Sequence, residues 1–321
     1  MASPRTVYSS WNKERYDLWW RYYETLNKRA EVYAQKRQAI YDDDNNNNNN
    51  NINRSRPLVL LGDSITESWS GTNLGIHKGR AEGVPQVLED ELAASSGFDP
   101  VVLAMSGDQT QHLLYRLQNG HMRAAQLLSP SSSTNNNNNK EGALEFFYDP
   151  STIFVVMIGT NNLGSGELPG PTTRGILAVV EYLLKETAEA GCHIMLFQVL
   201  PRGDGKKTLP KLCPPRCSDD DSKTPYTSFF PPIQKVNEAV QDGIQQLSET
   251  YSAGAAASRI QLVDCGSEFV NDKYDDRKDN DDDGHNYEVK KELMPDLLHP
   301  NAVGHRILAN CIRDYIDQID G

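Results

Sequence analysis

Short, continuous runs of hydrophobic residues alternate along the chain with longer stretches whose apolar residues recur every three or four positions. The runs lie at residues 57–61, 101–105, 153–158, 194–197 and 260–263. Strands that are apolar throughout are typical of a parallel sheet covered on both faces. The amphipathic stretches predict helices at residues 84–94, 110–117, 172–190, 233–251 and 302–319.

This repeated β–α alternation predicts one α/β domain, a three-layer α/β/α sandwich around a five-stranded parallel sheet. Ligands of such folds bind at the carboxyl ends of the strands, near the point where the strand order reverses. Polar motifs that follow directly after the predicted strands are therefore the candidate functional site.

The first fifty residues form a unit of their own. One helical stripe, with spacings of three and four, contains Tyr16, Trp19, Tyr23, Leu26, Ala30 and Tyr33. An asparagine tract at residues 45–51 follows and predicts a linker. We expect residues 1–54 to be this helix and linker, and residues 55–321 to be the main domain. The aromatic stripe docks on that domain or, alternatively, binds a partner or a second copy of the chain.

Composition excludes several classes of function. Of 321 residues, 32 are Lys or Arg and 44 are Asp or Glu, so the formal net charge is −12. That balance argues against nucleic-acid binding and against docking on anionic lipid through a polybasic face. No run approaches the roughly 18–20 apolar residues of a membrane helix, and the first residues lack the apolar core of a secretory signal. We expect a cytoplasmic protein without a membrane span.

The five cysteines are too few and too scattered to predict a disulfide framework. Cys213 and Cys217 lie four apart in a proline-rich loop, where a local disulfide, a metal site and ordinary thiols are all open interpretations. No second soft ligand pair completes a zinc site, so no metal is expected. The aspartate-rich run at residues 274–284 is expected to be a solvated loop.

Four strand-to-helix junctions carry candidate chemistry. Ser64 follows the first strand in the motif Gly-Asp-Ser-Ile, where helix amides favour a nucleophile and its oxyanion, although a plain helix cap uses the same residues. Gly107 follows the second strand and presents either a free N–H or a simple turn. Asn161 follows the third and is either an amide donor or part of an Asx turn.

The fourth junction precedes the last predicted helix. Asp296 and His299 are three residues apart, so the carboxylate can orient the imidazole and stabilise its charged form. The alternative is a surface histidine with an acidic neighbour. No other histidine in the sequence has a comparable arrangement with a carboxylate.

These four junctions, in this chain order, resemble the blocks of the SGNH (GDSL-type) hydrolases, which carry Ser, Gly, Asn and His. Further matches lie in residues 107–120, 158–162, 200–203, 236–237 and 296–299, and they are most similar to the catalytic subunits of intracellular type I platelet-activating-factor acetylhydrolase. The segment 102–106 lacks the Asn-x-Gly-x-Gly that commonly precedes the second block. Loop insertions are expected at residues 67–99, 129–142, 206–228 and 274–287.

The resemblance implies a flavodoxin-like fold and assigns roles by position. Ser64 is the implied nucleophile, His299 the general base and acid, and Asp296 the residue that orients it. The implied oxyanion hole comprises the N–H groups of Ser64 and Gly107 and the side-chain amide of Asn161. Asp63, next to the nucleophile, has an implied structural role.

The predicted function is therefore a serine esterase that removes a short acyl group, acetyl foremost, from a lipid-like or sugar-like alcohol. It requires no cofactor and no metal. The same residues are compatible with acyl transfer to another alcohol, and a non-catalytic scaffold or binding subunit is a further alternative. A homodimer or a partner contact through the N-terminal helix is left open as an alternative to its docking on the domain.

Overall fold

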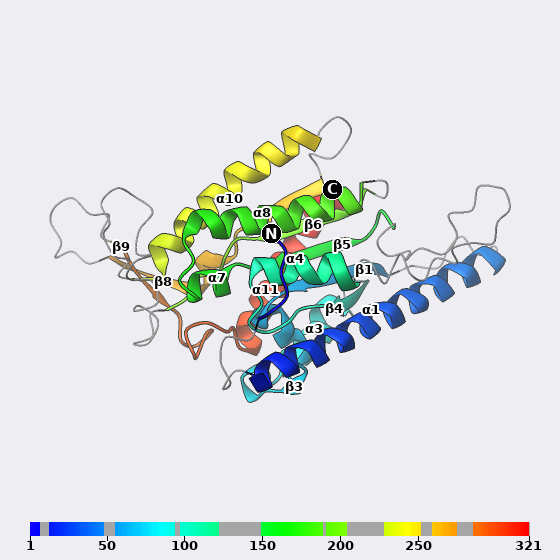
Figure 1. The fold of residues 1–321 in the computed structure, drawn as a ribbon, viewed down its shortest axis with the longest axis horizontal. Coiled ribbons are helices and arrows are strands. Elements are labelled where there is room, and N and C mark those ends of the chain that lie inside the picture. Colours follow the sequence, from blue (N-terminus) through cyan, green and yellow to red (C-terminus); the bar gives the residue numbers. More distant parts are fainter. Residues whose placement is uncertain are drawn as a thin grey trace.

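The structure is a computed structural model, and it describes residues 1–6, 13–47, 55–93, 97–121, 149–188, 191–203, 228–251, 259–274 and 285–320. Its centre is a five-stranded sheet in the order β4-β1-β5-β6-β7 (Figure 1). The strands are β1 (Arg56–Gly62), β4 (Phe98–Val102), β5 (Ile153–Met157), β6 (His193–Phe197) and β7 (Ile260–Val263). Every neighbouring pair is parallel. The predicted α/β class and five-stranded parallel sheet are confirmed.

Alternate residues of each strand enter two separate hydrophobic cores. In β1, Val59 and Leu61 belong to one core and Leu58 and Leu60 to the other. The first core is closed by α4 (Thr110–Arg116), α8 (Pro169–Glu186) and α10 (Phe230–Tyr251), and the second by α3 (Val84–Leu88) and α11 (Ala302–Asp320). Figure 1 shows α4, α8 and α10 in front of the sheet and α11 behind it. Because both faces are covered, the strands are apolar throughout.

Shorter elements connect this framework. The helix α2 (Ser64–Glu67) follows β1 and α7 (Thr160–Gly164) follows β5. Single turns of 3₁₀-helix span Ser68–Ser70, Gly79–Ala81 and Gly266–Phe269, and π-helical turns span Glu89–Ala93 and Leu117–His121. Two antiparallel hairpins, β2 (Thr72–Asn73) with β3 (Ile76–His77) and β8 (Val270–Tyr274) with β9 (His285–Val289), were not predicted from the sequence.

The second strand differs from its prediction. β4 ends at Val102, whereas the hydrophobic run at residues 101–105 predicts a strand that continues to Met105. The chain stays near β1 after Val102, because the N–H groups of Leu103 and Met105 donate to the carbonyls of Leu60 and Gly62. Residues 103–105 are apolar because they are buried, although they lie outside strand β4.

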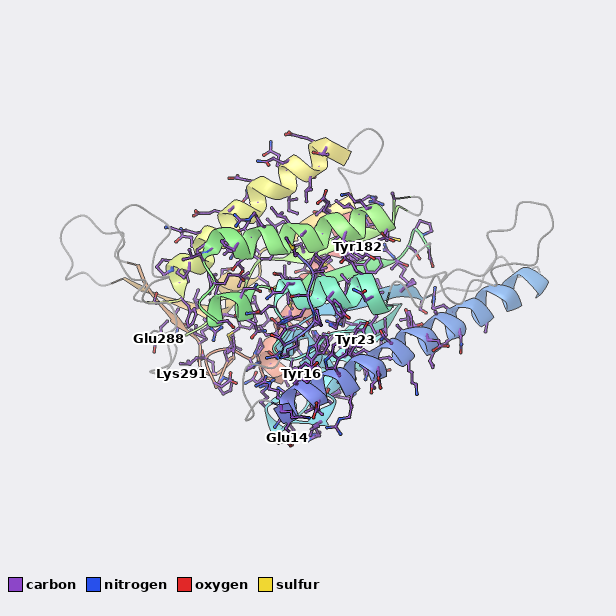
Figure 2. All side chains as sticks on the ribbon, in the orientation of Figure 1. Glu14, Tyr16, Tyr23, Tyr182, Glu288 and Lys291 are labelled. Carbon is purple, nitrogen blue, oxygen red and sulfur yellow. A yellow bond between two sulfur atoms is a disulfide. The ribbon has the colours of Figure 1, made fainter. Side chains whose placement is uncertain are left out.

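The N-terminal helix α1 (Lys13–Asn47) packs on the domain through its aromatic stripe. The side chains of Trp19 and Leu26 are fully buried, and Tyr23 lies on the face of α1 that meets the domain (Figure 2). The helix includes the first asparagines of the tract at residues 45–51, which the sequence analysis assigned to a linker. No glycine or proline interrupts the segment before Asn47, so nothing local ends the helix earlier.

One disulfide joins Cys265, after β7, to Cys311 on α11. This pair is not predictable from the sequence, because the two residues are separated by 46 positions and meet only when α11 packs behind the sheet. Cys192 is a buried thiol outside this disulfide, and it donates to the carbonyl of Asp149 at 3.3 Å. Cys213 and Cys217, and the aspartate-rich run at residues 275–284, lie outside the described residues.

Candidate active site

The junction between β1 and α2 admits only glycine at its first position. Gly62 has φ +157°, and a Cβ atom there would lie 2.2 Å from the carbonyl oxygen of Met157. The next residue, Asp63, caps α2 by accepting a hydrogen bond from the Ile65 N–H at 3.0 Å. Ser64 is therefore the first residue of a capped helix at the carboxyl edge of the sheet, and its side chain is buried.

The structure brings Ser64, His299 and Asp296 together. Ser64 Oγ lies 2.9 Å from His299 Nε2, and His299 Nδ1 lies 2.7 Å from Asp296 Oδ2. The other carboxylate oxygen of Asp296 accepts the backbone N–H of His299 at 2.7 Å and that of Leu298 at 3.1 Å. The histidine is thus held between a hydroxyl and a carboxylate that is itself fixed by the backbone.

The charge of Asp296 is stabilised by this turn. Partial burial raises the pKa of its carboxyl, but hydrogen bonds from the ring and backbone of His299 and from Leu298 outweigh it, and the pKa lies below its usual range. Leu297 between them has φ +63°, a strained conformation for a leucine. Its carbonyl accepts the Gly203 N–H at 2.8 Å, which holds the strained turn in place.

Gly107 lies on the loop after β4 in a left-handed conformation, with φ +79°. Its N–H donates to no acceptor among the described residues, so it is available to a substrate oxygen. Its carbonyl accepts a hydrogen bond from Nη1 of Arg5 at 3.1 Å, which places the N-terminal segment beside the site. The backbone angle therefore favours glycine at this position.

Asn161 lies at the start of α7, on the other side of β1 from Gly107. Its side-chain Nδ2 donates to the carbonyl of Asp108 at 2.9 Å and to Asp63 Oδ2 at 3.1 Å. Both amide hydrogens are engaged in the free protein. Donation to a substrate oxygen therefore requires that one of these bonds be shared or exchanged.

Asp63 is completely buried beneath this arrangement. Burial raises the pKa of its carboxyl to about 7, opposed by the hydrogen bond from the Ile65 N–H, while the neighbouring charge of Asp108 raises it further. The carboxyl group contacts the helix that carries Ser64 and the amide of Asn161, so it connects two of the junctions. This position agrees with the structural role that the family resemblance implies.

Sequence reasoning missed two buried acidic side chains that shape the site. Glu67, one helical turn after Ser64, accepts the Ser106 N–H at 2.7 Å and the Gly75 N–H at 2.9 Å, so it joins α2 to the loop that precedes Gly107. Asp108, next to Gly107, forms a fully buried ion pair with Arg116 at 2.7 Å. A charged residue beside a predicted buried strand could have indicated a buried ion pair or hydrogen bond. The partners could not be identified, because they are remote in the sequence.

The loop that carries Gly107 is also connected to α1. Trp19 Nε1 donates to the second oxygen of Asp108 at 2.7 Å, and both residues are fully buried. The carbonyl of the same Asp108 accepts the Asn161 amide. The aromatic helix is therefore hydrogen-bonded to the wall of the candidate site.

Replacement of Trp19 by Phe is expected to lower the free energy of unfolding by about 1–3 kcal/mol beyond the loss of ring volume, because Asp108 Oδ1 loses its donor in a buried position. Trp20→Phe is the matched control, since the buried Nε1 of Trp20 has no hydrogen-bond partner among the described residues. Urea unfolding of both variants measures the difference. An equal loss in the two variants would show that the Trp19 bond does not stabilise the fold.

Two further contacts position the junctions. Arg202 Nη1 donates to the carbonyl of Thr160 at 2.9 Å, and its guanidinium stacks 4.2 Å from the centre of the Phe229 ring, which fixes the start of α7. His305 on α11 is buried, and its Nε2 lies 3.1 Å from the carbonyl oxygen of Ile65. Burial lowers the pKa of His305 to about 4, so the ring is neutral and serves as a contact between two helices.

Two cavities border these residues. One, of ≈ 400 Å³, is lined by Arg5, Gly107, Gln109, Gln111, His112, Ser165 and Glu167 and is therefore strongly polar. The other, of ≈ 10 Å³, includes Asp63, Ile65, Met157 and Leu200 in its lining. A larger cavity of ≈ 460 Å³ lies between α10 and the ends of β6 and β7, and its lining includes none of the predicted site residues.

Residues 60–307 match the family model of the GDSL-like lipase/acylhydrolase family. The chain belongs to this family. The family is one of lipases and acylhydrolases, and this GDSL-like protein is a carboxylic ester hydrolase. The match covers every predicted site residue from Ser64 to His299. Among the described residues, no helix is long and apolar enough to cross a bilayer.

Solved structures of the same kind resemble the chain at low identity. A GDSL-like lipase from Bacteroides thetaiotaomicron is 17% identical, with a TM-score of 0.42, over 90% of this chain and 97% of that one. A catalytic mutant of an acetylxylan esterase from Geobacillus stearothermophilus is 16% identical, with a TM-score of 0.44, over 84% of this chain and 95% of that one. None of the curated proteins compared with the chain matches its sequence.

Proposed function

We propose that this GDSL-like hydrolase removes a short acyl group, acetyl foremost, from an alcohol through a covalent acyl-enzyme on Ser64. The observation that carries the proposal is the series of contacts from Ser64 Oγ to His299 Nε2 and from His299 Nδ1 to Asp296. A serine hydroxyl is a weak nucleophile at its own pKa, and a histidine within hydrogen-bond reach is the base that activates it.

The first half of the reaction forms the ester on the enzyme. His299 takes the Ser64 proton as Oγ attacks the substrate carbonyl carbon, and Asp296 holds the Nδ1 proton and stabilises the imidazolium without becoming protonated. The tetrahedral oxyanion accepts hydrogen bonds from the N–H groups of Ser64 and Gly107 and from the Asn161 amide. Loss of one such donor typically raises the barrier by about 2.7–4 kcal/mol.

The first half ends when the imidazolium of His299 protonates the alcohol oxygen, which leaves, so that the acyl group stays on Ser64. The second half releases the acid. The ring of His299 accepts a proton from the water that attacks the acyl-enzyme. Ser64 regains its proton when the second tetrahedral intermediate collapses. Every proton in this cycle passes through Nε2 of His299, which faces Ser64 Oγ.

The cavities support a short acyl group. A long alkyl chain gains about 0.8 kcal/mol for each buried CH₂ only where it finds apolar surface. Of the two cavities that border the candidate site, the ≈ 400 Å³ cavity is polar, and the more apolar one holds ≈ 10 Å³, about the room for a single water molecule. Neither provides an apolar channel for a fatty acyl chain.

A series of p-nitrophenyl esters from acetyl to dodecanoyl tests the acyl preference. We expect kcat/KM to be highest for acetyl and to fall by about tenfold or more by octanoyl, because the added carbons find no apolar cavity. A maximum at long chains would contradict the proposal. Addition of glycerol as an acceptor separates the two reaction types, since acyl transfer would yield glyceryl acetate in place of free acetate.

A further inference from the structure

The loop that presents Gly107 is a tight turn. The Asp108 N–H donates to the carbonyl of Met105 at 3.1 Å, which closes a β-turn over residues 105–108. Gly107, in the third position, has φ +79°, whereas Ser106, in the second, does not have a positive φ. This combination is typical of a type II turn. The N–H assigned to the oxyanion hole therefore belongs to the middle peptide of the turn.

The other N–H groups of this turn are paired within the protein. The Met105 N–H donates to the carbonyl of Gly62 at 3.1 Å, and the Ser106 N–H donates to Oε2 of Glu67 at 2.7 Å. Of the four N–H groups in the turn, that of Gly107 is the one without an acceptor among the described residues. The acceptor of the Ser106 N–H is a side chain, so a substitution can remove it.

Glu67 comes from the helix that begins with the nucleophile. α2 starts at Ser64 and ends at Glu67, whose N–H donates to the carbonyl of Asp63 at 2.8 Å. The first N–H groups of a helix have no acceptor within the helix, so the Ser64 N–H is suited to an oxyanion. Glu67 thus connects the helix that presents one proposed oxyanion donor to the turn that presents another.

The carboxylate of Glu67 is itself held in place. It is fully buried, and its Oε1 accepts hydrogen bonds from the Thr72 hydroxyl at 2.8 Å and the Gly75 N–H at 2.9 Å. Both donors belong to the β2–β3 hairpin. A Cβ atom on Gly75 would lie 2.7 Å from Cδ2 of Tyr22, so this hairpin packs closely on α1. With three donors on its two oxygens, the carboxylate is fixed and Oε2 faces Ser106.

Loss of the bond to Glu67 would displace the turn. Ser106 is fully buried, so its N–H would be left without water or carboxylate, and the backbone would shift towards another acceptor. The Gly107 N–H lies on the next peptide and would move with it. A displacement of about 1 Å in a group that acts on the reacting atoms can reduce the rate by roughly 10²-fold.

We propose that Glu67 is a positioning residue for the oxyanion hole, because it fixes the 105–108 turn against α2 and so keeps the N–H groups of Gly107 and Ser64 directed at the same oxyanion. This inference rests on the proposed esterase function. Glu67 does not touch the substrate and acts through the peptide of Ser106. Oxyanion donors stabilise the transition state when they are aligned beforehand, so the effect belongs to kcat and leaves substrate binding unchanged.

Glu67→Gln in the full chain tests this role. An amide has a single acceptor oxygen, which should stay at the hairpin, where two donors meet it, so that the NH₂ group opposes the Ser106 N–H. We expect kcat for p-nitrophenyl acetate to fall by about 10- to 100-fold, with KM changed by less than about threefold. The affinity for trifluoroacetone should fall by a similar factor, because addition of Ser64 Oγ to this ketone leaves a tetrahedral oxyanion.

Thr72→Val is the matched control. It also removes a hydrogen bond from Glu67, but at Oε1, which the Gly75 N–H continues to hold. It should lower the unfolding midpoint and leave both kcat and the affinity for trifluoroacetone unchanged.

Ser106→Pro removes the same bond from its other end, and it decides the question if Glu67→Gln does not fold. Proline suits the second position of a type II turn, and the lost hydroxyl of Ser106 has no hydrogen-bond partner among the described residues. Because proline lacks the N–H that Glu67 accepts, this variant should show the same fall in kcat and in affinity for trifluoroacetone.

Two results would overturn the positioning role. One is a kcat within about twofold of the wild type in Glu67→Gln or Ser106→Pro, and the other is an equal loss of kcat in Thr72→Val. In either case, labelling of the wild type by a fluorophosphonate would still support the esterase. A wild type that neither hydrolyses p-nitrophenyl acetate nor reacts with the fluorophosphonate would overturn the proposed function and this inference with it.

Discussion

Replacement of Ser64 by Ala is expected to reduce kcat for p-nitrophenyl acetate by about 10⁶-fold and to abolish labelling by a fluorophosphonate. The variant lacks the only oxygen of residue 64 that faces His299 Nε2, at 2.9 Å, so no acyl-enzyme forms. The oxyanion donors remain, and they leave a small residual rate above that of water. Mass spectrometry of the probe adduct and steady-state kinetics measure the two effects.

The fold should tolerate this change. The hydrogen bond from the Ser68 hydroxyl reaches the backbone carbonyl of residue 64, which alanine retains. Ser70→Ala is the control, because Ser70 follows in the next turn and contacts Arg29 instead of the site. Equal labelling of wild type and Ser64→Ala would show that the nucleophile lies elsewhere, and labelling lost in both variants would indicate a general disturbance of the segment.

The sheet could be predicted because its signal is local. The run at residues 57–61 is apolar in every position except its proline, and each residue of it is buried in β1. The end of β4 could not be predicted in the same way. Leu103, Ala104 and Met105 are as buried as strand residues, although they lie in the loop that leads to Gly107. Burial explains why residues 103–105 are apolar. Whether they belong to a strand depends on the path of the backbone, which a hydrophobic run does not reveal.

The arrangement of the candidate site was predictable only in part. Parallel strands place all their carboxyl ends at one edge, so Ser64, Gly107 and Asn161 were expected near one another. The contacts that hold them come from remote segments. Glu67 joins α2 to Ser106 across 39 positions, and Trp19 reaches Asp108 across 89. No periodicity or motif within a window of the sequence carries such pairings, and the approach of Arg5 to Gly107 across 102 positions is of the same kind.

The buried acids connect the segments that form the candidate site. Glu67 and Asp108 are fully buried, and each accepts hydrogen bonds from more than one segment of the chain. Removal of any one donor leaves a desolvated carboxylate oxygen, which costs more than the bond itself contributes. The candidate oxyanion loop is thereby coupled to α1, so the N-terminal helix is part of the support of the active site as well as of the core.

The second large effect is expected for Asp296→Asn, with kcat reduced by about 10⁴-fold at neutral pH. The asparagine oxygen should keep the place of Asp296 Oδ1, where it accepts the backbone N–H groups of Leu298 and His299. Its NH₂ group then faces His299 Nδ1, which must become an acceptor. The ring proton moves to Nε2 and points at Ser64 Oγ, so the base that should receive the serine proton already carries one.

We attribute the expected loss of kcat to the wrong tautomer of His299. A control variant that removes a different negative charge nearby separates this cause from a general effect of charge. Glu292→Gln removes an exposed acid four residues away and should keep full activity. Thermal unfolding should give a lower midpoint for Asp296→Asn, because the folded protein lowers the pKa of Asp296 and the amide loses that stabilised charge, although the two backbone hydrogen bonds survive. The kinetics are therefore measured well below both midpoints. A kcat within tenfold of the wild type would show that Asp296 does not set the tautomer of His299.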